Sequence, residues 1–267
     1  MWIVFLRAIK DRRLITLIYI LGIVAFLWMY VGLFPAMKDQ SASMEALIKN
    51  YPESFLKAFN FDIKNFTTLE GFISTEQFSF VWPIIIMFMT IGFAGGAFAG
   101  EIEKGTIEII LAQPISRAKI FWSRYLAGLL LLAIFTAASI YATIPLAKVY
   151  NLTYIGENYS TMFVLALLFS SAAYSLAMFF SSIFSDKGKV FFITGSIFVV
   201  MYVLNILSAI KDNLNDLKYF SFFYYFNPAK ALIYNDIDHW SYLVFGGVIL
   251  LSTIIGMIWF IRRDAVS

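Results

Sequence analysis

Six long apolar stretches, none with a charged residue between its ends, dominate this sequence of 267 residues. A helix needs about 20 apolar residues to cross a hydrocarbon core of about 30 Å. A charge at mid-membrane costs roughly 2.5–3.5 kcal/mol on insertion scales, so uncharged stretches of this length indicate transmembrane helices. The stretches are Leu14–Phe34, Phe78–Ala99, Tyr125–Ala147, Thr161–Phe184, Val190–Ile210 and Ser241–Ile261. The sequence therefore predicts an all-α polytopic membrane protein, with six transmembrane helices in a single transmembrane domain over residues 1–267.

The composition excludes several other classes of protein. Hydrophobic residues make up 61% of the chain and charged residues only 14%, too few to cover a water-soluble globule. Without cysteine and with a single histidine, the chain offers neither a disulfide framework nor a thiolate or multi-histidine metal centre, so we expect no bound metal. A net charge of +3 is too small to indicate nucleic-acid binding.

The distribution of Lys and Arg predicts the orientation in the membrane. The N-terminus, the loops 100–124 and 185–189 and the C-terminal tail together carry twelve basic and six acidic residues. The loops on the opposite side carry eight basic and eleven acidic residues. Because the basic side of a membrane protein faces the cytoplasm, both termini are predicted to be cytoplasmic.

Three segments outside the spans have a recognisable pattern. Residues 1–13 form an amphipathic segment that suits the headgroup layer, with basic side chains displaced from the apolar ones. The long external loop 35–77 contains two short amphipathic stretches, Met44–Lys49 and Pro52–Phe59, and could cap the external mouth or cover headgroups. The external loop 211–240 is rich in aromatic residues.

Small residues gather at the end of the second stretch. Gly92, Gly96 and Gly100 recur at every fourth position and are predicted to line one helix face that allows a neighbouring helix to approach closely. A phosphate-binding loop is excluded, because neither its Gly-x4-Gly-Lys-Ser/Thr pattern nor a preceding strand is present.

The fourth and fifth stretches contain polar side chains. Ser171, Tyr174, Ser175 and Asn205 could line a translocation path, or they could form hydrogen bonds between helices, which is the commoner use of such residues in membrane bundles. Both interpretations stay open at this point.

The cytoplasmic loop between the second and third stretches is the most informative segment. Gly105 can end the helix that descends from the second span, and Thr106 is then placed to cap a new short helix that Glu108 favours at its N-terminal end. This helix must stop before Pro114, and Ser116 can cap the next one. The result is a helix of about two turns that presents several apolar residues on the cytoplasmic surface. It could dip into the lipid or fill a groove on a partner protein, and the charges around it favour the protein partner.

The pattern Gly-Glu-x-x-x-Gly-Thr-x-Glu-x-x-Leu-x-x-Pro-x-Ser-Arg at Gly100–Arg117, after the second of six spans, resembles the signature of type-2 ABC exporter permeases. This resemblance implies a membrane-spanning permease that couples ATP hydrolysis by a separate ATPase subunit to export of a substrate. The chain itself would be no enzyme and would hold no cofactor, with ATP and Mg²⁺ bound on the ATPase. Two permeases, identical or different, and two ATPases would assemble in a prokaryotic cytoplasmic membrane.

The resemblance also implies which residues contact the ATPase. The segment 101–117 would be the coupling helix, residues 1–13 the connecting helix on the membrane surface, and Asp186 and Lys187 a second, smaller contact. The coupling residues would be Glu101, Gly105, Thr106, Glu108, Ile109, Leu111, Pro114, Ser116 and Arg117.

Three alternatives remain at the level of sequence. A permease of the same family could serve metalloenzyme maturation or cell-surface assembly. An ion-coupled secondary transporter would need ionisable groups inside the membrane, where the six stretches have none. An intramembrane enzyme using Glu101, Glu103 or His239 is disfavoured, because the acids and the histidine are predicted on opposite sides of the membrane.

Overall fold

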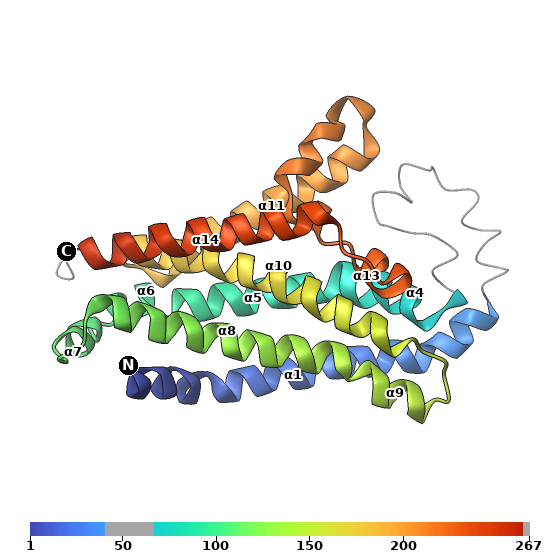
Figure 1. The fold of residues 1–267 in the computed structure, drawn as a ribbon, viewed down its shortest axis with the longest axis horizontal. Helices are drawn as coiled ribbons and strands as arrows, with labels where there is room; N and C mark the ends of the chain where they lie inside the picture. The colour runs from blue at the N-terminus through green and yellow to red at the C-terminus, as the bar shows by residue number, and fades with distance from the viewer. Residues whose placement is uncertain (41–66, 264–267) are drawn as a thin grey trace.

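The computed structural model describes residues 1–40 and 67–263 of the chain. The two helices predicted at Met44–Lys49 and Pro52–Phe59 lie outside these residues. All long elements of the described chain are helices arranged side by side in one bundle (Figure 1).

The first half of the described chain contains two long helices, a π-helix and several short helices. In chain order they are α1 (Trp2–Asp39), α4 (Leu69–Ile73), the π-helix η2 (Ser74–Val81), α5 (Trp82–Gly95), α6 (Ala99–Glu103), α7 (Ile107–Leu111), α8 (Arg117–Tyr141) and α9 (Thr143–Val149).

The second half adds three long helices and a cluster of short ones. They are α10 (Gly156–Ile183), α11 (Lys187–Ile210), the 3₁₀-helix η3 (Asp212–Phe220), α12 (Phe222–Tyr225), α13 (Pro228–Tyr234) and α14 (His239–Arg262). Short helices η3, α12 and α13 occupy the predicted external loop 211–240.

The prediction of six long apolar helices is confirmed. Within the described residues, six helical segments are long and apolar enough to cross a membrane, and each overlaps one predicted stretch. The second of them is shifted: it begins at Leu69 instead of Phe78, because α4 and η2 precede α5 without a break, and it ends at Gly95 instead of Ala99.

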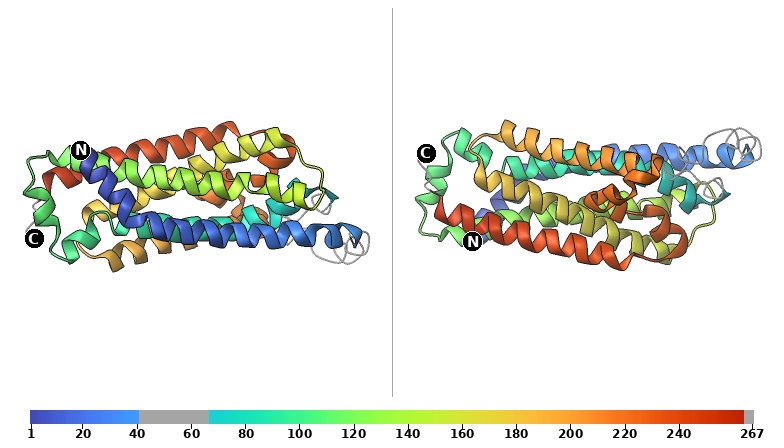
Figure 2. Two further views of the ribbon diagram at one scale, coloured as in Figure 1. Left: turned by 90° about the horizontal axis from the view of Figure 1, so that it is seen from below. Right: turned by 90° about the horizontal axis from the view of Figure 1, so that it is seen from above.

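The predicted surface segment 1–13 is the first part of α1 and not a separate helix. Figure 2 shows that α1 nevertheless changes direction near its N-terminal end. Trp2, Ile3 and Leu6 in this part are exposed, as the amphipathic pattern suggested, while Val4 is buried.

The core lies around α10, which packs against α14, α5 and α8. Its centre is aromatic: Trp82 is fully buried, stacks on Phe226 at a centroid distance of 5.4 Å, and lies 6.1 Å from the ring of Phe169. The indole N–H of Trp82 donates to the hydroxyl of Ser139 at 2.9 Å, so the one polar atom of this side chain has a partner.

In three helices, α1, α11 and α14, fewer than a third of the residues in the most apolar window are buried. Figure 1 shows the last part of α11 and η3 standing out from the bundle. Exposed apolar helices of this kind face lipid or another protein chain.

One end of the bundle gathers α6, α7, the first turn of α1 and the last turn of α14 (Figures 1 and 2). Both ends of the described chain lie at this end of the bundle (Figure 1). The loop 100–124 therefore lies at the same end of the bundle as the two ends of the described chain.

Candidate functional site

The segment from Gly100 to Arg117 folds as two short helices joined by a turn. Gly105 adopts φ +69°, a left-handed conformation that strongly favours glycine, and so separates α6 from α7. At the far end, the hydroxyl of Ser116 accepts a hydrogen bond from the backbone N–H of Lys119 at 3.4 Å and caps α8, as predicted. The predicted helix of about two turns is shorter than expected, since α7 covers only Ile107–Leu111.

The three predicted packing glycines do not form one continuous helix face. The helix α5 ends at Gly95, and a turn separates it from α6, so Gly96 and Gly100 leave the register of Gly92. A Cβ atom on Gly92 would meet Phe191 of α11 at 3.7 Å, and one on Gly100 would meet the Lys187 side chain at the same distance. Close approach to α11 thus occurs at two of the three positions, while Gly96 faces α1.

Thr106 occupies the position before α7, but its side chain does not cap that helix. Its hydroxyl instead donates to the carboxylate of Glu101, and its backbone N–H donates to the carbonyl of Glu101 at 2.9 Å. A hydrogen bond that a hydroxyl donates to a carboxylate is charge-assisted and stronger than one between neutral groups. Thr106 therefore closes the turn between α6 and α7.

Arg124, in the second turn of α8, is the buried cation beneath this turn. Its guanidinium lies 3.3 Å from the carboxylate of Glu101, donates to the carbonyl of Ala97, and lies over the ring of Phe98 at 5.9 Å. Only 9% of the residue is exposed. The sequence counted Arg124 as a loop charge; its role in holding the turn depends on the fold.

The short helix α7 has one anchored face and one free face. Ile107 is buried, and Ile110 and Leu111 pack against the core. Ile109 is 65% exposed, and Glu108 beside it is exposed as well. Of the other predicted coupling residues, Gly105, Pro114 and Ser116 are exposed, and Glu101, Thr106 and Arg117 are half-buried.

The loop between α10 and α11 lies against α6. The backbone N–H of Lys187 donates to the carboxylate of Glu103 at 3.0 Å, and the carboxylate of Asp186 accepts from the backbone N–H of Lys189 at 3.1 Å. Asp186 is half-buried as the cap of α11, whereas Lys187 is exposed. The two predicted contact regions are therefore joined within one protomer.

Two arginines connect the C-terminal end of α14 to α8 and to the end of α10 through hydrogen bonds. Arg117 donates to the carbonyls of Ile261, at 3.1 Å, and Arg263. Arg263 in turn donates to the carbonyls of Ser182 and Phe184 at 3.1 Å each. Cations are favoured at helix C-terminal ends, where carbonyls lack partners. Arg117, predicted as a coupling residue, is thus already engaged inside the protomer.

The polar residues predicted in the fourth and fifth spans occupy two different environments. Tyr174 and Ser175 are fully buried; the Ser175 hydroxyl lies 2.7 Å from that of Tyr125, which accepts from Thr253 of α14 at 3.0 Å. The hydroxyl of Tyr174 donates to the carbonyl of Arg124 at 3.3 Å. These contacts join α8, α10 and α14 and favour the alternative of hydrogen bonds between helices. Ser171 and Asn205 are half-buried.

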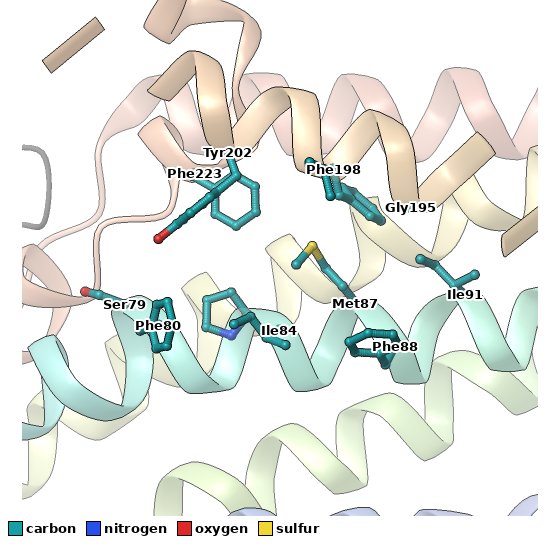
Figure 3. Close-up of a pocket in the computed structure, with 12 residues that line it drawn as sticks. Ser79, Phe80, Ile84, Met87, Phe88, Ile91, Gly195, Phe198, Tyr202 and Phe223 are labelled. Atoms are coloured by element: carbon teal, nitrogen blue, oxygen red, sulfur yellow. The ribbon is translucent and has the colours of Figure 1, made fainter. Parts of the chain in front are cut away.

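An apolar hollow of about 260 Å³ lies elsewhere, between α5 and α11 (Figure 3). Met87 and Ile91 on α5 face Phe198 and Gly195 on α11, and Tyr202 and Phe223 close one end. None of the four polar residues predicted to line a path contributes to it.

A buried acid at the opposite end of the bundle was missed from the sequence. Glu70, in α4, is 5% exposed and accepts a hydrogen bond from the backbone N–H of Ile155 at 2.7 Å, just before α10. Glu70 lay in the predicted external loop, so only the early start of the second span brings it into the bundle. Among the described residues, no three His, Asp or Glu side chains lie together as metal ligands would.

Comparison with known proteins bears on the whole chain. No curated protein matches it. The family model described as ABC-2 family transporter protein matches residues 1–265, which is almost the full length. Permeases of this family span the membrane several times and do not hydrolyse ATP themselves. With six apolar helices and this match, the chain belongs to the ABC-2 family of transporter membrane proteins.

Proposed function

We propose that the chain is the permease subunit of an ABC exporter, and that α7 is the coupling helix by which a separate ATPase subunit moves it. The observation that carries the proposal is the exposed pair Glu108 and Ile109, at the end of the bundle that holds the start of α1 and the end of α14. An apolar side chain that is 65% exposed beside a carboxylate suits a groove on a protein better than lipid.

The attachment of α7 to the bundle supports its proposed role in transmitting movement from the ATPase to the transmembrane helices. Ile107 is 2% exposed and holds one side of the helix to the bundle, so a force applied to Ile109 is transmitted to the protein and not absorbed by a loose loop. Behind it, the Glu101–Arg124 ion pair connects the turn to α8. A pull on α7 would therefore tilt the third span.

A second contact at Asp186 and Lys187 fits the same scheme. The carboxylate of Glu103 in α6 accepts a hydrogen bond from the backbone N–H of Lys187 at 3.0 Å, so both contact regions would move together. ATP binding would draw two ATPase subunits together, the coupling helices would follow, and the interface between two permease copies would change shape. ATP can shift the equilibrium between these two shapes of the complex only if it binds one of them more tightly than the other.

The orientation follows from the same assignment. With α7 facing an ATPase, both termini are cytoplasmic, in agreement with the excess of basic residues on that side. We place the complex in a prokaryotic cytoplasmic membrane. The apolar, aromatic hollow between α5 and α11 suits an amphipathic or lipid-like substrate better than a small ion.

Co-purification tests the proposal. The affinity-tagged chain, expressed in its own host, is expected to retain an ATPase, identified by mass spectrometry and by ATP hydrolysis in the eluate. Glu108→Arg, which reverses an exposed charge in the first turn of α7, is expected to lose most of that ATPase. Glu157→Arg is the matched control, because Glu157 is an exposed acid in the first turn of α10, at the other end of the bundle.

Two results would contradict the proposal. If both variants retain the ATPase equally, α7 is not the contact. If the purified chain alone transports a substrate in vesicles without any ATPase, the permease role in an ATP-driven complex is wrong.

A further inference from the structure

A small polar cleft separates the first turns of α1 from the loop that carries α7. Its volume is about 180 Å³, below the range of pockets that hold drug-sized molecules. Its charged lining consists of three arginines, Arg7, Arg12 and Arg124, and two acids, Asp11 and Glu101. The cleft therefore carries a net positive charge and has room for a small anionic group.

One cation of this cleft has no counter-charge among the described residues. Arg7 lies 3.9 Å from Asp11, and Arg124 lies 3.3 Å from Glu101, which leaves Arg12 without an ion pair. The guanidinium of Arg12 lies over the ring of Phe93 in α5, with 5.2 Å between its central carbon and the ring centroid.

Two buried guanidinium nitrogens in the lining also lack a hydrogen-bond acceptor. They are Nη1 of Arg12 and Nε of Arg124, the latter in a side chain that is nine-tenths buried. Leaving a buried charged donor unpaired costs more than leaving a neutral one, so such groups ordinarily have a partner. Guanidinium groups pair best with the oxygens of phosphate or carboxylate.

The position of the cleft favours the phosphate of a lipid headgroup over a soluble anion. Arg12 and Arg13 immediately precede the uncharged stretch that begins at Leu14, which places them at the depth of the lipid headgroups. In the first turn of the same helix, Trp2 and Ile3 are 67% and 79% exposed, as in segments that lie in the headgroup layer. Ile3, Val4 and Ile110 also line the cleft and give it an apolar surface that the glycerol of a lipid can contact.

We propose that this cleft binds the phosphate group of an anionic phospholipid, held by Arg12 with help from Arg124. The bound lipid would join α1 to the turn before α7, since both elements line the cleft. Lipid composition would then tune how rigidly α7 is attached. The site needs only the permease in a bilayer, so its test stands apart from that of the proposed ATPase contact.

The test uses the full chain, purified in detergent and titrated with phosphatidylglycerol, with phosphatidylcholine as the neutral lipid. Native mass spectrometry measures bound lipid, and thermal unfolding measures the shift in Tm that each lipid causes. The wild-type chain is expected to bind phosphatidylglycerol in preference and to gain Tm. Arg12→Gln is expected to weaken this binding at least about tenfold, because a charge-assisted hydrogen bond is lost.

Lys10→Gln is the matched control: it removes one positive charge from the same helix at an exposed position outside the cleft. It is expected to bind as the wild type does. Arg12→Lys keeps the charge and is expected to retain part of the affinity. Each Tm shift is compared with the same variant without lipid, so a loss of basal stability in Arg12→Gln does not obscure the result.

The other outcomes are decisive. Equal loss in Arg12→Gln and Lys10→Gln would show non-specific attraction and overturn the proposal. An equal Tm gain from inorganic phosphate would keep the phosphate site but reject the lipid as its source. Unchanged lipid binding in Arg12→Gln, with loss of a co-purified ATPase, would overturn the proposal in favour of a carboxylate on a protein partner.

Discussion

The carboxylate of Glu103 accepts a hydrogen bond from the backbone N–H of Lys187 at 3.0 Å, across 84 positions of sequence. Lys187 begins α11, where the first N–H groups have no partner within the helix. Glu103 therefore caps a helix to which it does not belong and joins α6 to the loop between the fourth and fifth spans. If both loops contact an ATPase, as proposed, this hydrogen bond would make them move together.

Glu103→Ala tests this connection. Removing the acceptor is expected to lower the free energy of unfolding by about 1 kcal/mol, the usual cost of losing a helix cap. Chemical denaturation in mixed micelles measures it. Glu157→Ala, an exposed acid in the first turn of α10, serves as control and is expected to change little. Equal stability of the two variants would show that the cap contributes nothing.

Arg124→Gln is expected to lower the free energy of unfolding much more than Glu103→Ala does. It leaves the Glu101 carboxylate and the carbonyl of Ala97 without their cation beneath the turn. Breaking a buried ion pair in this way costs about 3 kcal/mol. The measurement is again chemical denaturation in mixed micelles, here prepared from detergents without lipid.

The control for that variant is Arg7→Gln. The Arg7–Asp11 pair is 3.9 Å long, and its side chains are 74% and 64% exposed. Exposed pairs contribute only about 0–1 kcal/mol, so the expected loss is small. A loss in Arg124→Gln no larger than in Arg7→Gln would contradict a buried structural role for Arg124.

Gly128→Ala is expected to disrupt the packing of α8 on α10. A Cβ atom at Gly128 would overlap the hydroxyl of Tyr174, which is fully buried and cannot move aside freely. Overpacking of this kind costs about 1–3 kcal/mol. Gly246→Ala, where a Cβ atom meets nothing within 4 Å, is expected to be harmless. Comparable stability of both variants would contradict the close approach.

The Ser175–Tyr125 contact distinguishes the two interpretations of the polar span residues. If it is a bond between helices, Ser175→Ala and Tyr125→Phe are each destabilising, and a double-mutant cycle gives a coupling of about 0.6–1.7 kcal/mol. Unfolding measurements on the two single variants and the double variant supply the cycle. Zero coupling, combined with altered transport in Ser175→Ala, would instead support a residue of the translocation path.

Sequence reasoning was strongest where one physical requirement dominates. A charged group is costly in the bilayer, so uncharged stretches located all six spans. Gly105 and Ser116 were also placed correctly, because a left-handed turn and a helix cap depend on local backbone chemistry alone. The glycine face failed since a helix end at Gly95 breaks the register that the spacing assumed.

The sequence by itself determined the six spans, the family pattern at Gly100–Arg117 and the breaks on either side of α7, since these depend on solvent transfer and on neighbouring residues. The tertiary structure alone decided the partners of Arg124 and Glu103, because each meets groups distant in the chain. Charge pairing across such distances leaves no periodic trace in a sequence. It arises only when packed helices bring the side chains together and exclude water from between them.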